Sequence, residues 1–341
     1  MLLFGGVNEV NGDPLTYKVE GETVSVVKCD KNASGELVIP SFYEGKPVTS
    51  IGNGAFYDCS SLTSVTIPDS VTSIGRSAFS GCSKLTSVRI PDSVTSIGDR
   101  AFRYCSNLTN VTIGNSVTSV EGWTFDYCGS LTSVRIPESV ISIGKKAFAH
   151  CSSLTSVTIG NSVTSIGDLA FYDSVSLTSV TIPDSVISIG GRAFEYCGLT
   201  SVIIGDSVTS IGSNAFAYCS SLESITFRGN APNVFHIVSD FAKIFVNPGA
   251  TGFGETFGRL SVIILKKLRI NSFNNHAAPF NLSFVENRKS NSNSTYIIEA
   301  SHDLKKWGEI GEVQGTGSSV KFTDWREAIF RNQYYRVKLV E

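Results

Sequence analysis

Charged side chains are scarce in this chain. Asp, Glu, Lys and Arg make up 17% of its 341 residues, whereas about a quarter is usual for a soluble domain. The formal net charge is only −2, so the broad basic surface that nucleic-acid binding requires is not expected. Ser, Thr, Val and Gly take the place of the missing charged residues.

Long apolar runs are also absent. The run Val262–Leu265 is the longest near the C-terminus, far short of the roughly 18 residues that span a membrane. The N-terminal MLLFGGVNEVNGDP lacks the basic region and the apolar length of a signal peptide. Either the protein is cytosolic or its export signal is not part of this chain, and we expect no membrane insertion.

Sets of residues with catalytic or metal-binding spacing are missing as well. The four histidines are scattered and no CxxC pair occurs, so we predict no metal site and no cofactor. His150 belongs to a 23-residue repeat, and at the equivalent position other repeats have Gly81, Tyr104 and Tyr127. This variation indicates a surface position. The glycine pairs at Gly252 and Gly315 lack the context of a phosphate loop and are interpreted as turns. We therefore predict no catalytic residues and no enzymatic activity.

The cysteines follow a regular spacing instead of a pairing pattern. Cys59, Cys82, Cys105, Cys128 and Cys151 are 23 residues apart, Ser174 takes the next place, and Cys197 and Cys219 follow. We expect each thiol to fill the same buried position in its own unit, because free Cys behaves as a small apolar residue. Disulfides and metal binding stay open as alternatives.

This spacing belongs to an internal repeat. Near-identical units start at Leu62, Leu85 and Leu108 and continue to Leu199, and each carries a Phe at the same place. The stretch Leu-x-x-Val-x-Ile predicts a short strand that Pro or Gly ends, and Ser-Val-x-Ser-Ile-Gly suggests a second one. Ala-Phe-x-x-Cys is interpreted as a loose helical or 3₁₀ turn. One unit is too small to enclose a core, so the units must stack as a solenoid with a parallel sheet.

These units resemble the leucine-rich repeats of the BspA-like (Treponema-type) class, which have 23-residue coils with Ile-Pro after the strand and Ala-Phe-x-x-Cys before the next Leu. The resemblance covers residues 47–229 and implies a curved solenoid. It also implies a secreted or surface-exposed protein, bacterial or protist, that is used in attachment. The serines nearest to the Asn of ordinary leucine-rich repeats are Ser70, Ser93, Ser116, Ser139, Ser162, Ser185 and Ser207.

The fold class is therefore mainly β, in four parts. Residues 1–46 are the N-terminal segment and cap, and residues 47–229 are the leucine-rich repeats. Residues 230–265, where the period is lost, form a C-terminal cap, since open solenoid ends need protection. Residues 266–341 alternate apolar and polar positions and resemble a small fibronectin-III-like antiparallel β-sandwich with a core of aromatic residues, or less plausibly an aromatic platform for carbohydrate.

The candidate binding site is a row on the predicted sheet. The residue between Val and Ile of each strand points outward, which places Arg89, Thr112, Arg135 and Thr158 in one line if the coils are in register. Arginine offers donors for carboxylates, sulfates and glycan hydroxyls. Trp123 replaces a usually polar residue and is either a contact anchor or local packing. Carboxylates such as Asp69 and Glu138, which recur after Ile-Pro, are interpreted as turn chemistry.

We expect a monomeric, non-enzymatic extracellular or cell-surface protein. Its solenoid face would bind a protein or glycan on another cell or matrix, with no nucleic acid as partner. One alternative is a structural spacer of the cell envelope without a ligand of its own. Another is an ice or crystal-surface binder, which the interruptions of the threonine row by Arg89, Arg135 and Ile203 disfavour.

Overall fold

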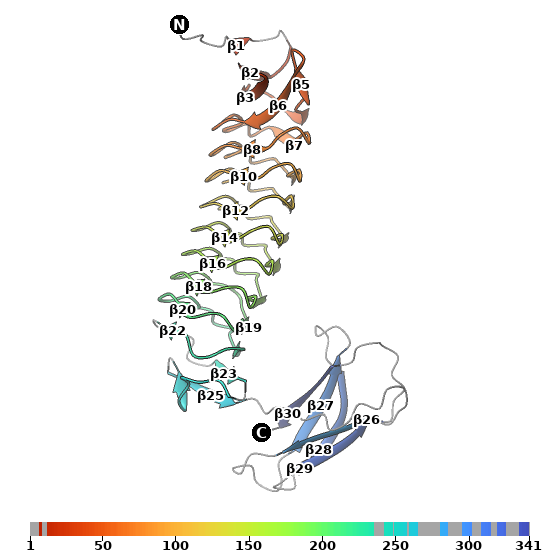
Figure 1. Cartoon of the computed structure of the whole chain (residues 1–341), viewed down its shortest axis with the longest axis vertical. Coiled ribbons are helices and arrows are strands. Elements are labelled where there is room, and N and C mark those ends of the chain that lie inside the picture. The colour runs from red at the N-terminus through yellow and green to blue at the C-terminus, as the bar shows by residue number, and fades with distance from the viewer. Residues whose placement is uncertain are drawn as a thin grey trace. The chain divides into compact units, whose positions relative to one another are not determined.

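The computed structural model describes residues 7–8, 12–234, 242–247, 249–257 and 259–264, and from there on only five strands. The described residues form strands and turns, and none of them is helical. The chain divides into two compact units, Met1–Ile263 and Ile264–Glu341. Figure 1 shows the first unit as a stack of similar coils.

The stack begins with a cap of mixed strands. Strands β1 (Val7–Asn8), β2 (Leu15–Glu20) and β3 (Thr23–Cys29) are antiparallel to one another. The following pairs are parallel: β3 pairs with β6 (Lys46–Ile51), and β4 (Gly35–Val38) pairs with the first strand of the first coil. β5 (Phe42–Tyr43) forms an antiparallel hairpin with β6. The cap therefore changes the sheet from antiparallel to parallel before the repeats start.

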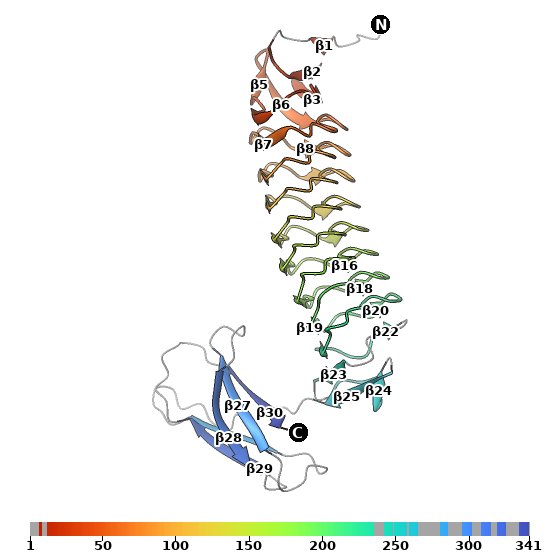
Figure 2. The same ribbon diagram turned by 180° about the vertical axis from the view of Figure 1, so that it is seen from behind.

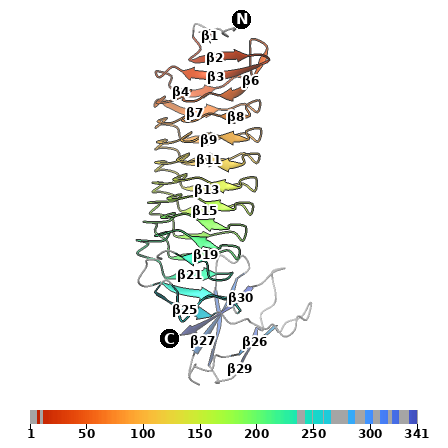
Figure 3. The ribbon, with the colours of Figure 1, turned by 60° about the vertical axis from the view of Figure 1, so that its left-hand side comes forward.

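Each repeat contributes a first, longer strand, as predicted from Leu-x-x-Val-x-Ile. These strands pair in parallel and in register, for example Val88 of one coil with Val111 of the next, in two sheets that divide between the strands starting at Ser156 and at Ser179. Figure 3 shows them one below another. They are β7 (Leu62–Thr66), β9 (Ser87–Arg89), β11 (Asn110–Thr112), β13 (Ser133–Arg135), β15 (Ser156–Thr158), β17 (Ser179–Thr181), β19 (Ser201–Ile204) and β21 (Ser224–Phe227).

The second strand suggested by Ser-Val-x-Ser-Ile-Gly is also present, two residues long in each coil. These strands stack in parallel on another side of the coils, visible from behind in Figure 2. They are β8 (Ser73–Ile74), β10 (Ser96–Ile97), β12 (Ser119–Val120), β14 (Ser142–Ile143), β16 (Ser165–Ile166), β18 (Ser188–Ile189), β20 (Ser210–Ile211) and β22 (Asn233–Val234).

The core runs through all coils without interruption. The repeated Leu, Val, Ile, Ala and Phe positions are almost all buried. Rings from Phe56 to Phe216 stack face to face with centroids 4.7 to 5.4 Å apart. Each coil thus covers its neighbour's apolar interior, which is the stabilising principle of a solenoid.

The Ala-Phe-x-x-Cys segment differs from the prediction of a helical or 3₁₀ turn. It is a chain of tight turns in which residues four apart, such as Arg100 and Tyr104, have left-handed backbone conformations. Successive backbone N–H groups alternate between an acceptor in the same coil and an acceptor in the next coil. That of Ala101 closes a turn on the Gly98 carbonyl, and that of Phe102 donates to Thr124 in the next coil at 2.9 Å. A helix would direct all of these groups along its own axis and could not bond neighbouring coils.

The thiols occupy the buried position predicted for them. All eight cysteines are buried and free. A coil thiol donates to the carbonyl of the Phe in the preceding coil, as Cys105 does to Phe79 at 3.2 Å. Ser174 makes the same bond, to Phe148 at 3.2 Å, which explains why serine fits this place. The sequence did not reveal this hydrogen bond.

The end of the stack is closed by irregular strands. β23 (Lys243–Val246) continues the parallel pairing of β21, and β24 (Thr256–Phe257) pairs antiparallel with β25 (Leu260–Ile264). Phe253 and Phe257 pack against Phe227 of the last coil. Aromatic rings thus cover the final apolar layer.

The second unit contains antiparallel strands where the alternating pattern predicted strands. β26 (Phe280–Val285) pairs with β29 (Ser319–Asp324). β27 (Thr295–Ser301) pairs with both β28 (Gly308–Gln314) and β30 (Tyr334–Val340). The fibronectin-III-like sandwich stays a prediction, and its expected core residues Trp307, Trp325 and Phe330 lie outside the described residues.

Candidate binding surface

Four consecutive first strands, β9, β11, β13 and β15, present one exposed row. Parallel pairing places Arg89 beside Thr112, and Arg135 beside Thr158. All four side chains are exposed, while the Val before each one points inward and is buried or nearly so. The sequence-predicted residues on the strands are therefore brought together, about 4.8 Å apart from coil to coil. We refer to Arg89, Thr112, Arg135 and Thr158 as the strand row.

Trp123 does not belong to this row. It lies in the turn segment, half-buried and in a left-handed conformation. The Arg100 guanidinium stacks over its ring at 4.5 Å, and the Lys145 ammonium lies 5.9 Å from the ring centroid. Cations on the indole favour local packing over the exposed-anchor interpretation.

The strand row carries little internal pairing. Arg89 lies 3.5 Å from Asp69, with both side chains mostly exposed, so this ion pair contributes little. Arg135 makes no ion pair with any described residue. Both guanidinium groups are therefore available to a ligand.

The acidic residues that follow Ile-Pro have a structural role. Asp92 accepts the backbone N–H of Asn115 at 2.8 Å, and Asp184 accepts that of Asp206 at 3.1 Å. Each carboxylate thus caps the equivalent turn of the next coil, which agrees with the interpretation as turn chemistry.

Serines at the position of the usual leucine-rich-repeat Asn bond across coils in alternate units. Ser93 donates to Val71, Ser139 to Val117 and Ser185 to Val163, at 2.7 to 2.8 Å. All three lie in units with Pro before the acidic residue, and Ser70, in the remaining unit of this kind, donates to Ser41 at 3.4 Å. The hydroxyl of Ser207 instead bonds Asp206 at 3.1 Å.

Threonine ladders are a feature that the sequence analysis missed. Just before β9, β11, β13, β15 and β19 a threonine hydroxyl donates to the carbonyl one coil earlier, as Thr109 does to Thr86 at 3.0 Å and Thr155 to Thr132 at 3.0 Å. The hydrogen of the hydroxyl is thereby used inside the protein. The exposed oxygen then offers acceptor capacity, which complements hydroxyl or N–H donors of a ligand.

A row of aromatic residues on the turn segments was also missed. Tyr104, Tyr127 and His150 stack in consecutive coils, with centroids 5.0 and 4.0 Å apart, and Tyr196 stacks on Tyr218 at 4.7 Å. The recurrence of Tyr two residues after the repeated Phe was a readable signal. Because the rings cover one another's faces, mainly ring edges and hydroxyls remain for contact.

The position of His150 is variable and its equivalents Tyr104 and Tyr127 are exposed, as predicted, but His150 itself is partly buried. Its side chain is 19% exposed, and Nδ1 lies 2.9 Å from Asp126, which is 1% exposed. The Arg103 guanidinium also donates to Asp126, at 2.8 Å. A buried carboxylate needs such partners, so His150 and Arg103 serve the packing of the turn segment.

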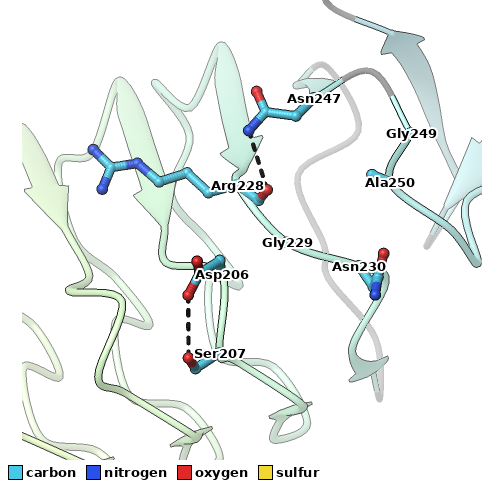
Figure 4. A pocket seen from close by; sticks show the side chains of 8 residues that line it. All are labelled: Asp206, Ser207, Arg228, Gly229, Asn230, Asn247, Gly249 and Ala250. Carbon is cyan, nitrogen blue, oxygen red and sulfur yellow. Dashed lines mark hydrogen bonds between the residues drawn. The ribbon is translucent and has the colours of Figure 1, made fainter.

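Two hollows accompany these surfaces. One of about 560 Å³ lies near the C-terminal cap, lined by Asp206, Ser207, Arg228, Gly229, Asn230, Asn247, Gly249 and Ala250. Figure 4 shows its polar side chains, with Asn247 bonded to the Arg228 carbonyl. The other, about 530 Å³, follows the second strands from Ser50 to Glu121. Within the described residues no cluster of His, Cys, Asp or Glu could hold a metal ion, and no helix is long and apolar enough to cross a membrane.

Comparison with known proteins agrees with this architecture. Residues 36–155 and 141–242 match the family model described as BspA type leucine rich repeat region, in six copies. A leucine rich cell surface protein of Faecalibacterium prausnitzii is 28% identical, with a TM-score of 0.51, over 75% of this chain and 93% of that one. No curated protein gives a significant match.

Two further solved structures are more distant. A leucine-rich repeat protein of Bacteroides ovatus is 24% identical over 74% of this chain and 99% of its own, with a TM-score of 0.36. The leucine rich repeat protein of T. pallidum is also 24% identical, over 74% of this chain and 91% of its own, with a TM-score of 0.33.

Proposed function

The chain belongs to the BspA-type leucine-rich repeat family, and from this membership we propose a non-enzymatic cell-surface or secreted protein that attaches to another cell or matrix. Its partner would be a protein or a glycan, bound through the face that carries the strand row. The surface location is supported by the Faecalibacterium prausnitzii relative, which is described as a leucine rich cell surface protein.

The observation that carries the proposal is the strand row itself. Exposed Arg89, Thr112, Arg135 and Thr158 stand in register on consecutive coils. A partner lying along the stack meets guanidinium donors and threonine hydroxyls, which can donate and accept, at regular intervals. Many modest contacts over such a face can add up to useful affinity.

A binding screen tests this proposal. The full chain is applied to an array of glycans and matrix proteins, beside the double variant Arg89→Ala/Arg135→Ala. Each charged hydrogen bond contributes about 1.5–3 kcal/mol, so the double variant is expected to bind at least tenfold more weakly to any partner found.

The matched control is Lys28→Ala/Lys84→Ala, which removes the same charge from exposed positions outside the strand row. It is expected to bind like the unaltered chain. Equal weakening by both variants would mean that net charge alone matters, and full binding by the arginine variant would remove the strand row from the account. Absence of any binding would favour the spacer of the cell envelope.

A further inference from the structure

The column of thiols ends differently at the N-terminal cap. In the inner coils each thiol has a close acceptor in the preceding coil, such as Phe102 for Cys128 at 3.2 Å. Cys59 belongs to the first coil and has no such Phe before it. Its sulfur lies 3.8 Å from the Asp30 carbonyl oxygen and 4.0 Å from that of Cys29, so it is only loosely bonded.

Cys29 comes to the same place from the cap. It is the last residue of β3, and its backbone N–H donates to Ala55 of the first coil at 2.6 Å. Its sulfur lies 3.5 Å from the Asp30 carbonyl oxygen. Both sulfurs therefore contact one oxygen atom, and both side chains are buried, at 2% and 0% exposure.

The two thiols also influence one another's ionisation. Their mutual hydrogen bond lowers the pKa of Cys59 and raises that of Cys29. In an inner coil, burial is the main influence on the thiol and raises the pKa of Cys105 to about 12. Since the thiolate is the reactive form, Cys59 is the thiol most ready to react.

We propose that Cys29 and Cys59 form a disulfide that fastens the N-terminal cap to the first coil when the chain folds in the presence of a disulfide oxidant. The Cys59 thiolate attacks one sulfur of the oxidant and forms a mixed disulfide with it, while the other sulfur of the oxidant leaves as a thiolate. The Cys29 thiol loses its proton to solvent and its sulfur attacks that of Cys59. The second half of the oxidant departs as thiol, so two protein thiols are oxidised and one disulfide is reduced.

The bond would act where a solenoid is weakest. Coils at the end of a stack have a neighbour on one side only, and the open edge invites pairing with other chains. A cross-link between β3 and the first coil restrains the cap in folded and unfolded states alike. The inner thiols stay reduced, because each is held on its own carbonyl acceptor.

The experiment folds the full chain with oxidised glutathione, unfolds it in guanidinium chloride with iodoacetamide present to block the remaining thiols, and then digests it with trypsin. Cleavage after Lys28, Lys31 and Arg76 separates the two cysteines into peptides 29–31 and 32–76. We expect these peptides to be joined, with the other six cysteines alkylated. The midpoint of thermal unfolding should rise by several degrees upon oxidation.

Variants separate this proposal from general oxidation. Cys29→Ser and Cys59→Ser should each abolish the linked peptide and the shift of the midpoint, and Ser174 shows that the column accommodates serine. Cys128→Ser should keep both. Recovery of both peptides in alkylated form, or a link from Cys59 to Cys82, would overturn the proposal.

Discussion

The repeated glycine after each second strand is set by a close approach between coils. A Cβ on Gly167 would lie 2.7 Å from the carbonyl carbon of Gly144, and one on Gly144 would lie 2.7 Å from that of Glu121. Real Cβ atoms do not come so near to backbone. The size of this residue, more than its flexibility, therefore determines how tightly the coils stack.

Gly167→Ala is accordingly expected to lower the free energy of unfolding by about 2 kcal/mol, since overpacking costs about 1–3 kcal/mol. The control is Gly129→Ala, where the nearest atom is the Ser152 hydroxyl at 3.6 Å and φ is not left-handed. That change should raise the free energy of unfolding by about 0.5 kcal/mol, because alanine lowers the conformational entropy of the unfolded chain. Chemical denaturation of both variants measures the difference, and equal effects would contradict the account.

At the level of strands, one departure from the repeat has a visible effect. Glu121 stands where the other coils have this glycine, and pairing of the second strands is interrupted between β10 and β12. The N–H of Gly98 donates to Ile74 and that of Gly144 to Val120, at 2.8 and 2.7 Å. The Glu121 N–H has no partner among the described residues. Its side chain instead accepts a bond from Ser119 at 2.6 Å.

Hydrogen exchange at this amide tests the explanation. The amide of Glu121 should exchange markedly faster than those of Gly98 and Gly144 because it lacks a protein acceptor. Glu121→Gly should slow exchange at position 121 by restoring the contact to Ile97. If the amide is already as protected as its equivalents, or if the glycine variant leaves exchange unchanged, the interruption has another cause.

The two strands of each coil could be predicted from the sequence, whereas the conformation of the turn segment could not. β-branched residues ended by Pro or Gly identify both strands of a coil. The turn segment was misjudged because most of its left-handed positions hold residues such as Ser77, Arg100 and Trp123, and only a few hold the Gly or Asn, such as Gly54 and Asn214, that usually signals this conformation. Pairing with the next coil stabilises these turns, and this is not encoded in local sequence.

At the scale of the whole stack, some features of the candidate site could be predicted from the sequence and others depend on contacts between coils. The strand row follows from repeat spacing alone, so its alignment was predictable. The threonine ladders and the Asp126 cluster depend on side-chain directions across coils. Trp123 was included in the candidate site because it replaces a usually polar residue, but it lies in the turn segment and not on the strands. Exposure and partners could therefore be assigned only with the coordinates.

The central claim is that the coils stack in register and bring the strand row together. The direct measurement is pyrene excimer fluorescence on full-length Cys29→Ser/Cys59→Ser chains that carry two introduced cysteines. The chains are labelled in the native state, where the six remaining native thiols are buried and should not react. Arg135→Cys/Thr158→Cys occupies adjacent coils and should give strong excimer emission. Thr66→Cys/Thr158→Cys, four coils apart and so roughly 19 Å at the spacing of paired strands, should give mainly monomer emission. Monomer emission from the adjacent pair, or equal emission from both, would contradict the stacked register.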